Sequence, residues 1–228
     1  MKYDILLIDA DDTLFDFRAC EKEAFYKAYT ESGYECNDEI YAEYSQINLS
    51  MWKMLERGEI DKARLKVERF EKLFSNHGIK GDAQALCSLY GRCLSECHTL
   101  IPGAKKFLEQ VNKTCRVYII TNGIAETQEK RFRDSGIDGL VDGVFISEKI
   151  GANKPSEAFF NHVMSKIPDF DISRAIVFGD SLTSDIKGAA NAGIASCLFN
   201  PDGKYLITDI RPTFTAETYC DFLKIIGE

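Results

Sequence analysis

Carboxylates beside a hydroxyl, together with one lysine, are the residues of this chain best suited to chemistry. Asp9, Asp11 and Thr13 directly follow the short apolar run Ile5–Ile8. Clustered carboxylates repel one another unless a cation or a proton compensates, and hard oxygen ligands favour Mg²⁺. A hydroxyl, backbone amides and an ammonium group suit phosphate oxygens. These residue types predict a magnesium-dependent phosphoryl-transfer site with a carboxylate nucleophile. The other candidate residues are Thr121, Asn122, Lys154, Asp180 and Asp185.

Short apolar runs followed by helical patterns must position these side chains. The runs are Ile5–Ile8, Val117–Ile120, Val144–Ile146, Ala175–Phe178 and Ala195–Phe199. The helical patterns cover 126–135, 157–167, 184–192 and, with Thr215 as its cap, 216–226. Continuous apolar strands that alternate with helices predict an α/β fold whose parallel sheet is covered on both faces. Ligands bind at the carboxyl ends of such strands, where most of the candidate residues fall.

Residues 16–99 break this alternation, because no strand pattern occurs in them. Four helical stretches are predicted, at 17–32, 38–57, 62–76 and 83–98, with glycines between them and with Asp61 and Asp82 as N-caps. We therefore expect two domains. Residues 1–15 and 100–228 form the α/β core, and residues 16–99 form an inserted all-helical domain.

The composition excludes several classes of binding partner. The 228 residues include 28 basic and 36 acidic side chains, which gives a formal net charge of −8, and 45% are hydrophobic. This apolar content excludes intrinsic disorder. The acidic balance, without a Lys/Arg stripe, argues against a nucleic acid polymer as partner. No run approaches the ~20 apolar residues of a membrane span, so no membrane partner is expected.

The N-terminal run and the cysteines predict a cytoplasmic protein. Ile5–Ile8 is closed by acidic residues, which is typical of a buried strand and not of a secretory signal. The eight cysteines are then expected as reduced thiols. Cys93 and Cys97 have a spacing of four residues, but no second Cys or His pair completes a metal site, so buried packing is the preferred interpretation.

The ordered motifs resemble those of the haloacid dehalogenase-like hydrolases. They are Asp9-x-Asp11-x-Thr13, Thr121 after a hydrophobic strand, Lys154-Pro155, and Gly179-Asp180-x4-Asp185. The resemblance extends from the first predicted strand to the fifth. It implies a three-layer, Rossmann-like core, with the helical insertion as a mobile cap placed after the first motif.

The resemblance also implies a role for each matching residue. Asp9 resembles the nucleophile that forms an aspartyl-phosphate, and Asp11 the general acid and base. The implied Mg²⁺ ligands are Asp9, the backbone carbonyl of Asp11, and Asp180. Asp185 is expected to hold metal-bound waters or to orient Lys154. The residues that resemble the phosphate-binding set are Thr121, Asn122 and Lys154.

Asp12 departs from the family pattern, in which Gly or Asn is more usual, and we assign it no catalytic role. Dehalogenation is disfavoured because dehalogenases need no acid at the position of Asp11. A phosphomutase remains open. A receiver-like phosphoacceptor domain is the distant alternative, but its acceptor aspartate should end the third strand, which here ends in Ile146-Ser147-Glu148.

Longer stretches resemble the bacterial pyrimidine 5′-nucleotidases that clear noncanonical nucleotides. This implies a small phosphorylated metabolite as partner, a nucleoside 5′-monophosphate, whereas sugar phosphates and other small metabolites are the alternative. Phe15, Phe17 and Trp52 are candidates to stack on a base, and packing within the cap or hinge is the alternative for each. The stretches are Asp9–Phe17, Gly58–Ile60, Arg69–Phe70, Ile150–Pro155, Gly179–Asp185 and Asn200–Pro201.

Overall fold

The computed structural model describes residues 2–203 and 209–227, and the chain divides into two compact units. The core unit comprises Met1–Phe17 and Thr99–Glu228, and the helical unit comprises Arg18–His98. The helical unit thus begins two residues after the boundary expected at residue 16 and ends one residue before the boundary expected at residue 99.

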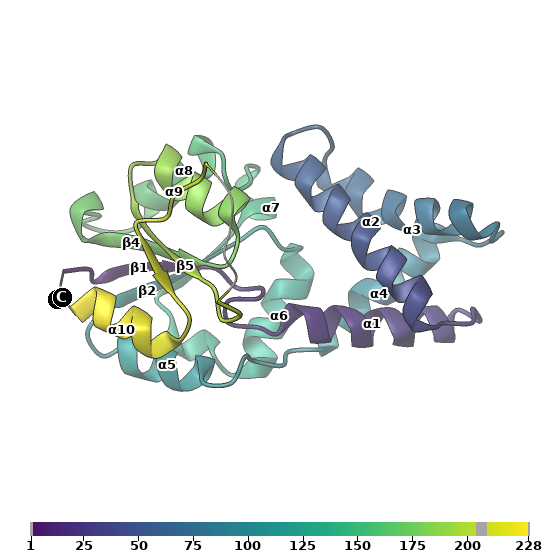
Figure 1. The fold of residues 1–228 in the computed structure, drawn as a ribbon, viewed down its shortest axis with the longest axis horizontal. Coiled ribbons are helices and arrows are strands. Elements are labelled where there is room, and N and C mark those ends of the chain that lie inside the picture. The colour runs from purple at the N-terminus through teal and green to yellow at the C-terminus, as the bar shows by residue number, and fades with distance from the viewer. Residues whose placement is uncertain (1, 204–208, 228) are drawn as a thin grey trace. The chain divides into compact units, whose positions relative to one another are not determined.

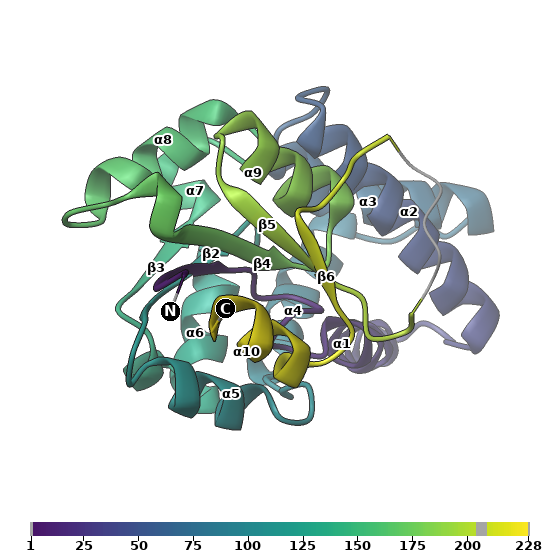
Figure 2. The same cartoon turned by 60° about the vertical axis from the view of Figure 1, so that its left-hand side comes forward.

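The core unit contains a parallel six-stranded sheet with the strand order β3-β2-β1-β4-β5-β6 (Figure 2). Ile8 of the central β1 is in register with Ile119 of β2 and Phe178 of β4, so these three strands end side by side. The predicted α/β fold is therefore confirmed. The strands are β1 Ile5–Ile8, β2 Arg116–Thr121, β3 Gly143–Ile146, β4 Ala175–Gly179, β5 Ala195–Phe199 and β6 Phe214–Ala216.

Helices cover both faces of the sheet (Figures 1 and 2). Leu6 and Ile8 point into a cluster with side chains of α5 Ala104–Val111, α6 Ala125–Ser135 and α10 Tyr219–Gly227. The intervening Ile5 and Leu7 pack against α8 Glu157–Lys166 and α9 Lys187–Asn191. Because both faces are buried, the strand is a continuous apolar run. The short helical segments are α7 Ser147–Ile150 and the 3₁₀ turns Asp138–Leu140 and Ile172–Arg174.

The C-terminal part of the core unit differs from the prediction in three places. The helix predicted at 184–192 begins as a π-helical turn, Leu182–Ile186, before α9. The helix predicted from residue 216 is preceded by β6, an edge strand, so Thr215 lies in the sheet and caps nothing. Thr218 is the actual cap: its Oγ accepts from the Asp221 N–H, while its own N–H donates to the Asp221 carboxylate. Helix α5 was not predicted, because it has only eight residues.

The helices of the helical unit are α1 Phe17–Glu31, whose first residue belongs to the core unit, α2 Asp38–Glu56, α3 Lys62–His77 and α4 Ala83–Glu96 (Figure 1). The predicted N-caps are confirmed, since Asp61 accepts from Arg64 N and Asp82 from Ala85 N. Helix α4 ends two residues before the predicted position 98. Stacked and edge-to-face aromatic rings fill the centre of the helical unit. They belong to Phe25, Tyr29, Tyr44, Phe70 and Tyr90.

All eight cysteines lie in described residues and are free thiols, six of them buried, Cys36 partly buried and Cys220 exposed. No helix in the described part of the chain is long and apolar enough to cross a bilayer.

Candidate active site

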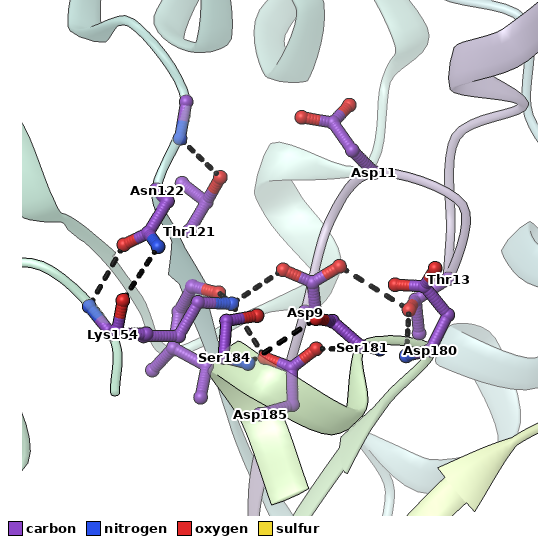
Figure 3. Close-up of polar contacts among 12 residues, drawn as sticks. Asp9, Asp11, Thr13, Thr121, Asn122, Lys154, Asp180, Ser181, Ser184 and Asp185 are labelled. Atoms are coloured by element: carbon purple, nitrogen blue, oxygen red, sulfur yellow. Dashed lines mark hydrogen bonds and ion pairs between the residues drawn. The ribbon is translucent and has the colours of Figure 1, made fainter. Parts of the chain in front are cut away.

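The predicted site residues lie at the carboxyl ends of β1, β2 and β4 and in the loop that carries Lys154 (Figure 3). Asp9 follows β1, and its N–H donates to Phe178 O of β4 at 2.9 Å. Thr121 ends β2, and Asp180 follows β4. Parallel pairing of adjacent strands brings side chains that are more than 100 residues apart to one edge of the sheet.

Lys154 is the centre of this arrangement. Its Nζ donates to Asp9 Oδ1 at 2.6 Å, Asp185 Oδ1 at 2.7 Å and Ile120 O at 2.8 Å. These three acceptors use all three N–H bonds of an ammonium group whose side chain is 1% exposed. Burial by itself lowers the pKa of Lys154, but the adjacent Asp185 and Asp9 carboxylates outweigh burial and raise it. Lys154 is therefore a charged partner of Asp9.

Asp9 is buried and accepts from two side chains. Lys154 bonds one carboxylate oxygen, and Thr13 Oγ1 donates to the other, Oδ2, at 3.3 Å. Burial raises the pKa of Asp9 to about 7, because the lowering by Lys154 does not fully offset it. The pKa of Asp180 is also raised well above its usual value, first by burial and then by the charges of Asp9 and Asp185. Three carboxylates thus face a single ammonium group, an electrostatic imbalance that a bound cation would correct.

A metal ion fits these residues. Asp9, Asp180 and Asp185 each offer a ligand atom, and these atoms lie within 4.8 Å of one another. Asp185 already accepts from Lys154 through Oδ1 and from the Ser181 N–H through Oδ2 at 3.1 Å. Asp185 is fully buried between these two donors, whereas the second oxygen of Asp9 accepts only the longer 3.3 Å bond from Thr13, which makes Asp9 and Asp180 the better candidate ligands. A Cβ atom at Gly179 would lie 2.4 Å from Asp185 Oδ2, so the glycine allows this carboxylate its position.

Thr13 and Tyr219 tie the loop after β1 to the rest of the core unit. Thr13 Oγ1 accepts from Asp180 N at 3.1 Å while it donates to Asp9. Tyr219, at the start of α10, donates its hydroxyl to Thr13 O at 2.7 Å. Thr13 therefore holds the first and fourth motifs together. No motif points to Tyr219, which lies 206 residues from Thr13 in the chain.

Thr121 and Asn122 use their side chains differently. Thr121 Oγ1 accepts from Gly123 N and from Gln128 Nε2, both at 3.0 Å. The Asn122 side chain instead forms a reciprocal pair with the Lys154 backbone: it donates to Lys154 O and accepts from Lys154 N, each at 2.9 Å. Asn122 thereby fixes the segment that carries Lys154, and the predicted phosphate contact falls to its backbone N–H.

Two residues of α6, Gln128 and Arg131, contact Asp11 and were missed in the sequence. Arg131 Nη1 donates to Asp11 Oδ1 at 2.5 Å, and Gln128 Nε2 donates to Asp11 Oδ2 at 2.8 Å. Both are 1% exposed. Their spacing of three residues on a helix that directly follows Thr121-Asn122-Gly123 puts them on one helix face, and this was the available signal.

The structure also shows the backbone conformation of Asp12 and the packing of Phe15. Asp12 has φ 57°, in the left-handed region that Gly and Asn adopt most readily and Asp tolerates. The family's preference for Gly or Asn at this position thus has a backbone cause. Phe15 is fully buried, and its ring packs against Phe132 and under Arg131. The burial of Phe15 supports the packing alternative and not stacking on a substrate base.

The open parallel sheet with an aspartate-rich, lysine-paired site at its carboxyl edge makes this an α/β protein whose site suits phosphoryl transfer. The model of the haloacid dehalogenase-like hydrolases matches residues 3–193, and the chain belongs to that family. Its members use Mg²⁺.

Individual relatives agree with this assignment. The HAD-hydrolase YfnB of Bacillus subtilis is 37% identical over 93% of this chain and 91% of its own. A crystal structure of YfnB bound to magnesium, which reveals interdomain movement, matches with a TM-score of 0.94 at 35% identity over 100% of both chains. The pyrimidine 5′-nucleotidase PynA of Streptococcus pneumoniae is 34% identical over 100% of this chain and 97% of its own. The pyrimidine 5′-nucleotidase YjjG of Escherichia coli is 28% identical over 96% and 95%.

Proposed function

We propose that this chain is a magnesium-dependent phosphatase that hydrolyses pyrimidine nucleoside 5′-monophosphates through an aspartyl-phosphate on Asp9. The contact of Lys154 with both Asp9 and Asp185 carries the proposal, since it holds a buried carboxylate beside a positive charge at the sheet edge. The names of PynA and YjjG support the choice of substrate.

In the first half-reaction, a carboxylate oxygen of Asp9 attacks phosphorus and the bond to the ester oxygen breaks. Asp11 gives its proton to the leaving alkoxide, so the nucleoside departs as a neutral alcohol. Asp11 lies two residues after Asp9 in the loop that leaves β1, so both belong to the same edge of the sheet. Lys154 offsets negative charge on Asp9 as the oxygen approaches the phosphoryl group.

In the second half-reaction, Asp11 is a carboxylate and takes a proton from water. The water oxygen bonds to phosphorus while the bond between Asp9 and phosphorus breaks. Inorganic phosphate leaves, Asp9 is again a carboxylate, and Asp11 again carries its proton. The Thr121 hydroxyl and the Asn122 backbone N–H are the proposed phosphate donors in both halves.

Asp9, the Asp11 carbonyl and Asp180 are the residues we propose to hold Mg²⁺, which supplies charge neutralisation for the phosphate and for the carboxylates around it. Asp185 is proposed to act through Lys154, because it is fully buried and accepts directly from the Lys154 ammonium and from the Ser181 N–H. The helical unit is the proposed cap, which would exclude water during the reaction.

A substrate panel tests this function. Initial rates are measured on uridine, deoxyuridine, thymidine and cytidine 5′-monophosphates, on hexose phosphates, and on p-nitrophenyl phosphate, with Mg²⁺ and with a chelator. We expect the highest kcat/KM for pyrimidine nucleotides, since this ratio measures discrimination, and no activity in chelated enzyme.

The variant Asp9→Asn should fold and show no turnover on any ester. Turnover by Asp9→Asn at the wild-type rate would contradict the assignment of Asp9 as the nucleophile. If a hexose phosphate has a higher kcat/KM than every nucleotide, the proposed substrate class is wrong. The proposed phosphatase activity would still stand.

A further inference from the structure

The amide of Gln128 connects two groups of the proposed mechanism. Its Nε2 donates to Asp11 Oδ2 at 2.8 Å and to Thr121 Oγ1 at 3.0 Å, which uses both amide hydrogens. Its Oε1 accepts from Arg131 Nη1 at 2.9 Å. The reverse orientation of the amide would set its oxygen against the Asp11 carboxylate and its NH₂ against the guanidinium. The contacts therefore determine one orientation.

The contacts of Thr121 fix the direction in which its hydroxyl donates. A hydroxyl has two acceptor positions and one hydrogen. Gly123 N and Gln128 Nε2 occupy the two acceptor positions of Thr121 Oγ1. The hydroxyl hydrogen is thus directed to a third atom, and a phosphate oxygen is a suitable acceptor.

The Asp11 carboxylate is oriented by the same two residues of α6. Arg131 donates to Oδ1 and Gln128 to Oδ2, so two donors on different oxygens define the plane of the carboxylate. Arg131 is itself fixed, because its guanidinium carbon lies 4.3 Å from the centre of the buried Phe15 ring. The orientation of the Asp11 carboxylate is therefore fixed by α6.

Gly123 supplies an independent observation on the same amide. A Cβ atom at this position would lie 2.5 Å from Gln128 Nε2 and 2.6 Å from its Cγ. Contacts this short force the amide to move. The loop after β2 therefore needs a glycine at 123 in order to admit the Gln128 side chain between Thr121 and Asp11.

We propose that Gln128 is a positioning residue for phosphate hydrolysis: its amide orients the Asp11 carboxylate and makes the Thr121 hydroxyl a donor to phosphate. Arg131 holds the amide in that orientation. This role rests on the phosphatase function proposed above. Gln128 acts only through Asp11 and Thr121 and exchanges no proton with the substrate.

Gln128→Met tests the role, because Met keeps the length of the side chain and removes both donors. We expect kcat on a pyrimidine nucleotide to fall about 10- to 100-fold, as when a reacting group is misplaced. The dissociation constant of inorganic phosphate, measured by calorimetry, should rise about 3- to 10-fold, the value of one hydrogen bond. Glu126→Ala, an exposed change on the same helix, is the control and should match wild type. Thermal melting confirms that each variant is folded.

A double-mutant cycle separates positioning from a general structural effect. Gln128→Met is also made in the Asp11→Asn background, with p-nitrophenyl phosphate as substrate, because its leaving group needs no acid. The loss in kcat from Gln128→Met should be at least about 5-fold smaller in that background, since interacting residues are not additive. Gly123→Ala, which displaces the amide from the opposite side, should lower kcat and weaken phosphate binding as Gln128→Met does.

Equal losses from Gln128→Met in both backgrounds would overturn the role, as would wild-type turnover and phosphate binding by folded Gln128→Met. The phosphatase function fails separately. If wild type hydrolyses no phosphate ester while Asp9→Asn behaves identically, the proposed function is wrong. If wild type is active and Gln128→Met equals it, only the role of Gln128 is wrong.

Discussion

Lys154 Nζ lies 2.6 Å from Asp9 Oδ1 and 2.7 Å from Asp185 Oδ1, so one buried ammonium group joins two carboxylates from different strand ends. Lys154 is 1% exposed, and Asp185 is fully buried. Buried ion pairs of this kind are costly to break, because the partner that remains keeps an uncompensated charge away from water. The same contact therefore affects both stability and the proposed chemistry.

Lys154→Met should destabilise the core unit strongly. It leaves Asp9 and Asp185 without their counter-charge, and breaking a buried pair costs about 3–5 kcal/mol. Urea unfolding in the presence of a chelator measures the decrease in the free energy of unfolding. Lys149→Met is the matched control: this exposed lysine pairs with Glu129 at the surface and should cost less than about 1 kcal/mol. A folded Lys154→Met protein with the stability of the control would contradict the interpretation.

The pH dependence of stability should reveal the raised pKa of Asp9. Burial raises this pKa from 3.8 to about 7, so the native state keeps a proton that the unfolded state loses at lower pH. Stability rises with pH where the unfolded state binds more protons, and here the native state binds more. The free energy of unfolding of chelated protein should therefore fall between about pH 4 and pH 7 and level off above.

Two comparisons isolate this contribution in urea titrations at several pH values. Asp9→Asn should show a smaller fall over the same pH range, with a remainder from Asp180, whose pKa is also raised. Added Mg²⁺ should reduce the fall, because a cation compensates the carboxylates. An identical pH dependence in wild type and Asp9→Asn would exclude Asp9 as the source.

Strand positions were predictable because the physical cause is local. Ile5–Ile8 is fully buried on both faces of a parallel sheet, and such strands are continuous apolar runs. Once adjacent strands are parallel, the placement of Asp9 and Asp180 at one edge follows from topology. Helix α5 and β6 were missed because each is short, and β6 pairs with only one neighbour, β5.

The contacts of Gln128, Arg131 and Tyr219 could not be predicted in the same way. Glutamine, arginine and tyrosine on a helix are most often surface or packing residues, and their roles here depend on which loop lies opposite. Gln128 meets Asp11 across 117 positions of sequence, and Tyr219 meets Thr13 across 206. The residue types carried little information until the fold placed them.

The helical unit contains a buried polar relay, which is a chain of hydrogen bonds from Arg69 through Asn48 to Glu21. Breaking it should lower the free energy of unfolding. Arg69 donates to Asn48 Oδ1 at 2.8 Å, and Asn48 donates to Glu21 Oε1 at 2.6 Å. All three side chains are buried, and burial raises the pKa of Glu21 despite the opposing bonds from Asn48 and the charge of Arg69. Arg69→Met should therefore cost about 3–5 kcal/mol, since Glu21 loses its counter-charge.

A second substitution tests the relay. Glu21→Leu combined with Arg69→Met should cost less than the sum of the two single variants, because the double variant leaves no lone buried charge. Arg64→Met, an exposed arginine on the same helix that pairs with Glu68, is the control and should cost less than about 1 kcal/mol. Simple additivity in urea unfolding would contradict a coupled pair.

The roles of Asp11 and Asp9 differ in how strongly each depends on the leaving group. A general acid matters most when the leaving group is a poor one, and general acid catalysis contributes about 10²- to 10⁴-fold. Asp11→Asn should therefore lower kcat/KM on a nucleoside monophosphate far more than on p-nitrophenyl phosphate. It should also accumulate phosphoenzyme, seen by intact-protein mass spectrometry after acid quenching, because the base for the second half-reaction is absent. Asp12→Asn, which removes a neighbouring charge and suits the left-handed backbone there, controls for charge and should keep the wild-type ratio between the two substrates. Equal losses of Asp11→Asn on both substrates, with no phosphoenzyme, would show that Asp11 is not the proton donor.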